Sequence, residues 1–116
     1  MITTQYMTIN DEVDLWESWI DKQVIGSQEV NMLYVMGEIL ADASNGKPLL
    51  VKKKIQSTPK ELHLEVMPPQ FVNKLISEEV FYSEVIDDLD TYNTVVIHNG
   101  NQEITYIDEI EILEEL

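Results

Sequence analysis

The spacing of apolar side chains along the chain changes several times, and each change predicts a different element. Residues 2–9 are rich in β-prone side chains. From Asp11 to Ile25, apolar residues recur every three or four positions, as on one face of an α-helix. They are Val13, Trp16, Ile20 and Val24, with Leu15 and Trp19 beside them. Asn10 is a favourable N-cap and Gly26 a favourable residue after a helix C-terminus. We therefore predict an amphipathic helix over 11–25.

The next three apolar segments have the composition of strands. Val30–Leu40 is dense in large and β-branched residues, and Leu49–Ile55 follows a turn over Asp42–Gly46. Glu61–Met67 alternates, with Leu62, Leu64 and Val66 on one face and Glu61, His63 and Glu65 on the other. Three consecutive antiparallel strands are the natural prediction.

A second helix is expected after Pro68-Pro69, because proline is accepted in the first turn of a helix. Apolar residues at helical spacing carry this helix to about Asp88, with a break near Ser77. Two short β-prone runs, Thr94–His98 and Glu103–Ile107, then flank an Asn-Gly turn, which predicts a hairpin.

The tail from Ile107 to Leu116 fits either a strand or a helix. We favour a strand to about Leu113 with a bulge near Asp108. The whole chain is then predicted to be a single α+β domain over 1–116. Its order is α-β-β-β-α-β-β: a mainly antiparallel sheet of about five strands, with two or three helices on one face.

Composition places limits on the kind of protein. The 116 residues contain no cysteine, which leaves no disulfide framework and no thiolate nucleophile. The apolar run Met32–Met36 is too short to cross a bilayer. The start of the chain has neither the basic nor the apolar region of a signal peptide. We expect a cytoplasmic protein.

The charges are distributed very unevenly. All seven basic residues are lysines, and five of them lie between Lys47 and Lys60, a stretch without an acid. From Glu78 onward there are twelve carboxylates and no basic residue. A net charge of −15 opposes direct contact with nucleic acid or an anionic membrane and favours attraction to a basic protein surface.

The triplet Lys52, Lys53 and Lys54 resembles a binding patch. Neighbouring side chains on a strand point to opposite faces, however, so the three lysines cannot form one surface. If Leu49 and Val51 face the core, Lys53 shares their side, and an inward-leaning lysine protects an edge strand from pairing with another chain. Edge protection is the preferred interpretation.

Candidate chemistry is sparse. His63 lies between Glu61 and Glu65 on the polar side of a predicted strand, and His98 lies beside a predicted turn. His63 with its two glutamates could supply a mixed nitrogen and oxygen metal site, although exposed strand residues are the simpler explanation. The chain has no nucleophile-elbow, phosphate-binding-loop or dinucleotide-binding motif. We assign no catalytic residue, no metal ligand and no cofactor.

The function best supported by the sequence is that of a non-enzymatic module that binds a basic partner, including an inhibitor that mimics the charge of nucleic acid. The predicted second helix and the C-terminal hairpin would provide the contact. The candidate partner-binding residues are Glu78, Glu79, Glu84, Asp87, Asp88, Asp90, Phe81 and Tyr82.

Three other interpretations stay open. A small metal-dependent or ligand-binding enzyme-like domain would use His63 or His98 with nearby carboxylates. A homo-oligomer would pair through Val30–Leu40 or through the tail. Trp16 and Trp19 would both lie in the core, but a tryptophan at the edge of the apolar stripe would instead anchor a partner.

Overall fold

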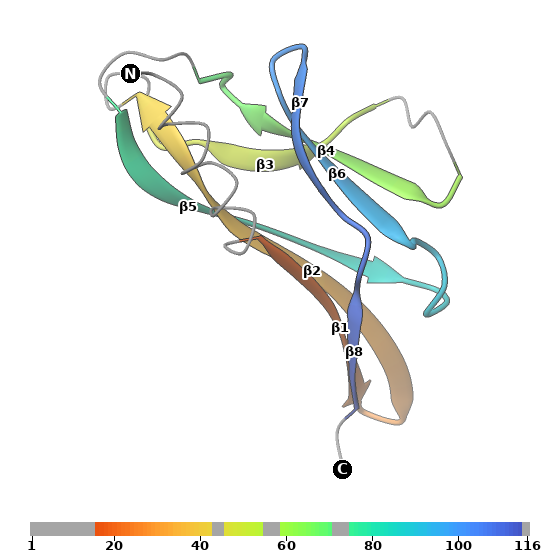
Figure 1. The fold of residues 1–116 in the computed structure, drawn as a ribbon. Helices are drawn as coiled ribbons and strands as arrows, with labels where there is room; N and C mark the ends of the chain where they lie inside the picture. The colour runs from red at the N-terminus through yellow and green to blue at the C-terminus, as the bar shows by residue number, and fades with distance from the viewer. Residues whose placement is uncertain (1–15, 43–45, 55–58, 71–74, 115–116) are drawn as a thin grey trace.

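The computed structural model describes residues 16–42, 46–54, 59–70 and 75–114, and these form two facing β-sheets (Figure 1). The strands are β1 (Glu17–Ile25), β2 (Gln28–Asp42), β3 (Leu49–Lys52), β4 (Glu61–Met67), β5 (Leu75–Ile86), β6 (Thr94–Asn99), β7 (Gln102–Ile107) and β8 (Glu111–Glu114). The first sheet has the order β5-β2-β1-β8, and the second has the order β3-β4-β6-β7. We call them sheet A and sheet B.

The core lies between the two sheets and is built from alternating positions of their strands. In sheet A, Leu33, Val35 and Ile39 of β2 point inward with Ile20 of β1, and all are buried. The residues of sheet B that belong to this core are Leu50, Leu62, Leu64, Val66, Val95, Ile97 and Ile107. Because side chains alternate along a strand, each buried row leaves a second row on the outer face of its sheet.

The chain passes between the sheets several times, so sequence neighbours are often not spatial neighbours. β4 and β6 pair in parallel in sheet B, while β5, which lies between them in sequence, belongs to sheet A. Figure 1 shows β7 leading out of sheet B directly into β8, which pairs in parallel with β1 of sheet A. The last strand therefore ties the two layers together.

The predicted α+β fold is wrong, because the structure has no helix in its described residues. Residues 17–25 of the first predicted helix form β1, and residues 11–15 lie outside the described part. The spacing that indicated a helix is ambiguous: Trp16, Ile20 and Val24 are four residues apart, which also places them on one face of a strand. Gly26 does not end a helix. It has a φ of 66° and begins the two-residue turn Gly26-Ser27, of type II′, between β1 and β2.

The prediction of the second helix is also wrong, because its apolar spacing fits a strand as well as a helix. Residues 75–86 form β5, in which Val80 and Ile86 are buried while Phe81 and Val85 are exposed. Tyr82 and Ile86 satisfy both a helical and an alternating pattern. Pairing over twelve residues with β2 selects the strand.

Several other predictions are confirmed in whole or in part. β4 has the predicted bounds and alternation, and β6 and β7 form the predicted hairpin, with Gly100 in its turn. The tail is the favoured strand, although it changes sheet after Ile107. The three predicted consecutive antiparallel strands are only partly correct, because β3 pairs with β4 but β2 belongs to the other sheet. In the part of the chain that is described, no helix has the length and apolar character needed to span a membrane.

The close contact between Trp16 and Gly37 yields a first prediction. The indole of Trp16 occupies the space that a Cβ on Gly37 would need. We expect Gly37→Ala to lower the free energy of unfolding by about 1–3 kcal/mol, the usual effect of overpacking a core. Urea denaturation measures this loss. Replacing Trp16 by leucine in the same chain should recover part of the loss, and an unchanged stability of Gly37→Ala would contradict the contact.

Candidate functional site

The outer face of sheet A carries large apolar side chains where a solvated sheet would ordinarily carry polar ones. Trp19 of β1, Tyr34 of β2 and Phe81 of β5 lie side by side across three strands. The Trp19 and Tyr34 rings are 5.4 Å apart between centroids, and the Tyr34 and Phe81 rings are 5.7 Å apart. Met32, Met36 and Val85 occupy neighbouring positions on the same face. We call these six residues the aromatic face.

The aromatic face is accessible to a partner within the described structure. Phe81 is 50% exposed and Val85 is 59% exposed, and Trp19 and Tyr34 are partly exposed. The strand register fixes their neighbours: Trp19 lies opposite Tyr34, Phe81 opposite Met36, and Val85 opposite Met32. The row is therefore set by backbone pairing and needs no rearrangement to form.

Carboxylates surround the aromatic face on the same side of the sheet. The register places Glu17 opposite Met36, Asp21 opposite Met32, and Glu111 opposite Trp19. At the other end of β2, Glu38 lies directly opposite Glu79 of β5. We call these five acidic residues the rim. Like charges directly opposite each other on neighbouring strands are unfavourable, and Glu38 is held by a hydrogen bond of 2.8 Å that its Oε1 accepts from Ser77 Oγ.

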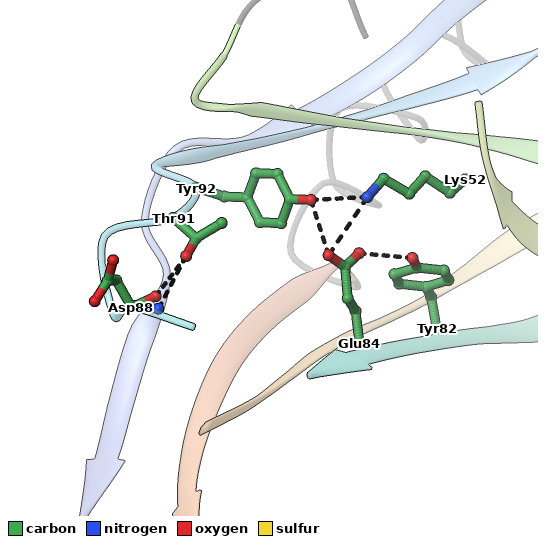
Figure 2. Close-up of polar contacts among 6 residues, drawn as sticks. All are labelled: Lys52, Tyr82, Glu84, Asp88, Thr91 and Tyr92. Carbon is green, nitrogen blue, oxygen red and sulfur yellow. Dashed lines mark hydrogen bonds and ion pairs between the residues drawn. The ribbon is translucent and has the colours of Figure 1, made fainter. Parts of the chain in front are cut away.

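The structure separates the eight residues that the sequence grouped as one partner-binding surface. Only Glu79 and Phe81 lie with the aromatic face and its rim. Tyr82 and Glu84 point toward sheet B (Figure 2), and Glu78 shares their side of β5. Asp87, Asp88 and Asp90 are exposed in the loop after β5. A helix would have gathered these residues, whereas a strand alternates them between its two faces.

The inward-pointing Glu84 is the centre of a polar network between the sheets (Figure 2). Tyr82 donates a hydrogen bond of 2.8 Å to its Oε1, and Tyr92 donates one of 2.9 Å to its Oε2. Lys52 of β3 donates to Oε2 at 3.4 Å and to the Tyr92 hydroxyl at 3.0 Å. Four side chains from both sheets thus satisfy one another at the margin of the core.

This network changes the proton affinities of its members. Burial, reinforced by the hydrogen bond to Glu84, raises the pKa of Tyr82 well above its ordinary value. Burial likewise raises the pKa of Tyr92, because Lys52 only partly opposes it. The hydrogen bond to Tyr92 and the charge of Glu84 raise the pKa of Lys52. Each group therefore holds its proton more firmly in the folded chain.

The lysine triplet is arranged differently from the prediction. Leu50 is buried and Leu49 is 62% exposed, so the inward side of β3 is the reverse of the predicted one. The inward-leaning lysine is consequently Lys52. β3 is an edge strand, as edge protection requires. Lys53 lies on the other side of the chain, near His98, whose pKa is lowered by burial and, in addition, by the charge of Lys53.

The two histidines, 35 residues apart in sequence, meet on the outer face of sheet B. His63 Nδ1 lies 2.8 Å from His98 Nε2, and His63 Nε2 lies 3.1 Å from Glu61 Oε1. The sequence placed His63 near Glu61 but gave no sign of the contact with His98. That contact depends on the parallel pairing of β4 with β6, which sequence spacing does not reveal.

The tryptophans also have different environments. Trp16 packs against the core over Gly37, and Trp19 lies on the aromatic face. Sequence reasoning missed Tyr34 and Met36, because it treated Val30–Leu40 as a mostly buried strand. Because Tyr34 and Met36 alternate with Leu33 and Val35, the sequence did indicate that they lie on the opposite face of the strand.

Comparison with known proteins adds no functional information. No family model, no curated protein and no solved structure matches this chain. The function is therefore argued from the surfaces themselves.

The inter-sheet network predicts that Glu84 contributes more to the stability of the fold than the exposed Asp90 does. Glu84→Gln should lower the free energy of unfolding by about 1–3 kcal/mol, because one of the two oxygens that accept from the Tyr82 and Tyr92 hydroxyls becomes an NH2 donor and Lys52 loses its opposite charge. Asp90→Asn removes an equal charge whose partner, Lys60, is 3.6 Å away at the surface. This control should change stability by less than about 0.5 kcal/mol. Equal effects in chemical denaturation would argue against the network.

The same network predicts a dependence of stability on alkaline pH. Tyr82, Tyr92 and Lys52 all have raised pKa values in the folded chain. Their contribution to the free energy of unfolding is complete below the pKa values that these groups have in the unfolded chain, near 10 for tyrosine. It is lost as the pH rises above those values. Urea midpoints measured from pH 8 to pH 11 should therefore fall less steeply for Tyr82→Phe than for the wild type. Tyr106→Phe, at an exposed tyrosine of sheet B, should follow the wild-type curve.

Proposed function

We propose that this protein is a non-enzymatic interaction module that binds a basic protein surface through the aromatic face and its acidic rim. The observation that carries the proposal is the row Trp19, Tyr34 and Phe81, exposed on a sheet and surrounded by carboxylates. The proposed surface retains Glu79 and Phe81 of the sequence prediction. It replaces the other residues by those that the register places beside them.

The apolar part of this surface is suited to supplying affinity. Aromatic residues and methionine are enriched in the centres of protein interfaces, and exposed apolar patches with polar borders mark interaction sites. Trp19 and Tyr34 are held by backbone pairing and by their own ring contact. Little side-chain freedom would be lost on binding, which favours affinity.

The acidic part determines the chemistry of the partner. Glu38 and Glu79 lie directly opposite each other on neighbouring strands, and a lysine or arginine from a partner would relieve their repulsion. A cation placed over Trp19 or Phe81 would also be attracted by the ring. The net charge of −15 would accelerate the encounter with a basic surface.

In a narrower version of this proposal, the basic partner is a nucleic-acid-binding protein, and the carboxylates occupy the positions of phosphates. Pairing of the apolar patch with another copy of the chain would be a different function, which the rim carboxylates and the net charge of −15 oppose.

The test uses a synthetic peptide rich in lysine with one leucine and one tyrosine, titrated into the ¹⁵N-labelled protein. We expect the Trp19 indole signal and the outer residues of β1, β2 and β5 to shift, with the Trp16 indole unaffected. Phe81→Ala should weaken binding by about tenfold or more, as expected for an interface anchor. Light scattering of the free protein tests self-association.

Glu79→Gln provides the sharpest variant, because its effects on folding and binding should have opposite signs. Removing one of two opposed carboxylates should stabilise the free protein by about 0.2–1 kcal/mol. The same change should slow peptide association and reduce its salt dependence. Glu29→Gln, at an exposed carboxylate beside the first turn, is the matched control and should leave binding nearly unchanged.

Several outcomes would contradict the proposal. Shifts confined to the loop after β5, or equal losses from Glu79→Gln and Glu29→Gln, would show that charge alone attracts the peptide. The nucleic-acid version requires that the protein compete with a short DNA duplex for a DNA-binding protein, and that Phe81→Ala abolish this competition.

A further inference from the structure

The His63–His98 contact has the geometry of two ring nitrogens pointing at each other. The ring centroids are 5.1 Å apart and the ring planes are inclined by 26°. The nitrogen-to-nitrogen distance is only 2.8 Å. It is shorter than the distance between the centroids by about the sum of the radii of the two imidazole rings. The imidazoles therefore meet edge to edge, with His63 Nδ1 and His98 Nε2 on the line between them.

The fold fixes this meeting through strand register. His63 of β4 lies opposite Val96, and His98 of β6 lies opposite Glu65. The histidines are thus diagonal neighbours on the outer face of two parallel strands, within reach of each other's side chains. Both are partly buried, and the His63 side chain is only 12% exposed. Their positions depend on the central pair of sheet B and not on a loop.

Glu61 determines which nitrogen of His63 carries the proton. A carboxylate only accepts hydrogen bonds when ionised, so His63 Nε2 must donate to Glu61 Oε1. In the neutral ring, Nδ1 is then an acceptor, and it faces His98. A carboxylate bound to the remote nitrogen of a histidine is also the usual support of a metal-binding imidazole, because it fixes the tautomer and increases ligand basicity.

The surrounding charges favour a cation. Glu65 of β4 and Glu103 of β7 are the cross-strand neighbours of His98 on its two sides. Lys53 opposes them with a single positive charge near His98. Three carboxylates against one ammonium group leave the site negative.

We propose that His63 Nδ1 and His98 Nε2 bind a divalent transition-metal ion of the zinc class, with Glu61 as a positioning residue. Zinc–nitrogen bonds of 2.0–2.1 Å at a tetrahedral angle require nitrogens about 3.3 Å apart, so the rings must separate by about 0.5 Å. The rings must also tilt, because their nitrogens now point straight at each other and both lone pairs have to converge on an ion beside that line. His98 must also carry its proton on Nδ1. In the described residues no set of three or more His, Asp or Glu side chains is already arranged around a metal. Water, or Glu65 or Glu103 after a rotamer change, completes the coordination.

The site is independent of the proposed interaction surface, because it lies on the other sheet. Its test is a calorimetric titration of the intact protein with Zn²⁺, together with NMR signals of the imidazole nitrogens. We expect saturable binding, shifts at His63 Nδ1 and His98 Nε2, and a melting temperature that rises with Zn²⁺. His98→Gln and His63→Gln should each weaken binding at least tenfold. Glu61→Gln should weaken it about tenfold while both histidines remain.

Controls separate this site from general attraction to an acidic protein. Mg²⁺, which prefers oxygen ligands, should not shift the imidazole signals. The double variant Asp87→Asn and Asp88→Asn removes two exposed carboxylates and should bind Zn²⁺ like the wild type. Affinity should fall between pH 7.5 and pH 5.5, because protons compete for the imidazoles.

Three results would overturn the proposal. One is the absence of saturable Zn²⁺ binding. Another is undiminished binding by His98→Gln, whose fold is verified by its amide spectrum. The third is a set of Zn²⁺-induced shifts confined to carboxylate signals in the loop after β5.

Discussion

The constraint on which the structure depends is the burial of one face of each sheet against the other. Leu33 and Val35 of sheet A and Leu62 and Leu64 of sheet B are fully excluded from water. Since side chains alternate along a strand, fixing these residues inside also fixes which residues lie outside. Trp19, Phe81 and His63 lie on the outer faces of the sheets because their sequence neighbours point toward the core.

The same constraint explains how much of the fold the sequence could predict. The Glu61–Met67 strand was predicted correctly because its polar and apolar residues alternate without ambiguity. The segments containing Trp16 and Ile20, or Tyr82 and Ile86, space apolar residues by four, which fits helices and strands equally well. Long-range pairing decided between them. The Gly26-Ser27 pair was the local signal for a hairpin, but it was interpreted as the end of a helix.

The candidate sites were less predictable than the fold, for a topological reason. Phe81 could be selected from sequence as an apolar residue among carboxylates. Its neighbours Met36 and Tyr34 become neighbours only through the pairing of β2 with β5. His63 and His98 meet because β4 and β6 are adjacent although β5 separates them in sequence. Contacts of this kind depend on strand order, which local periodicity does not encode.

The parallel pairing of β8 with β1 has a mechanical consequence. Trp19–Lys22 is hydrogen-bonded to Glu111–Glu114 in the same direction. Tension applied between the start of β1 and the end of β8 would slide these strands along each other. The backbone hydrogen bonds between them would then bear the load together, in shear, instead of opening one after another. The sandwich is therefore built to resist extension along this axis more strongly than peeling of its β6–β7 hairpin.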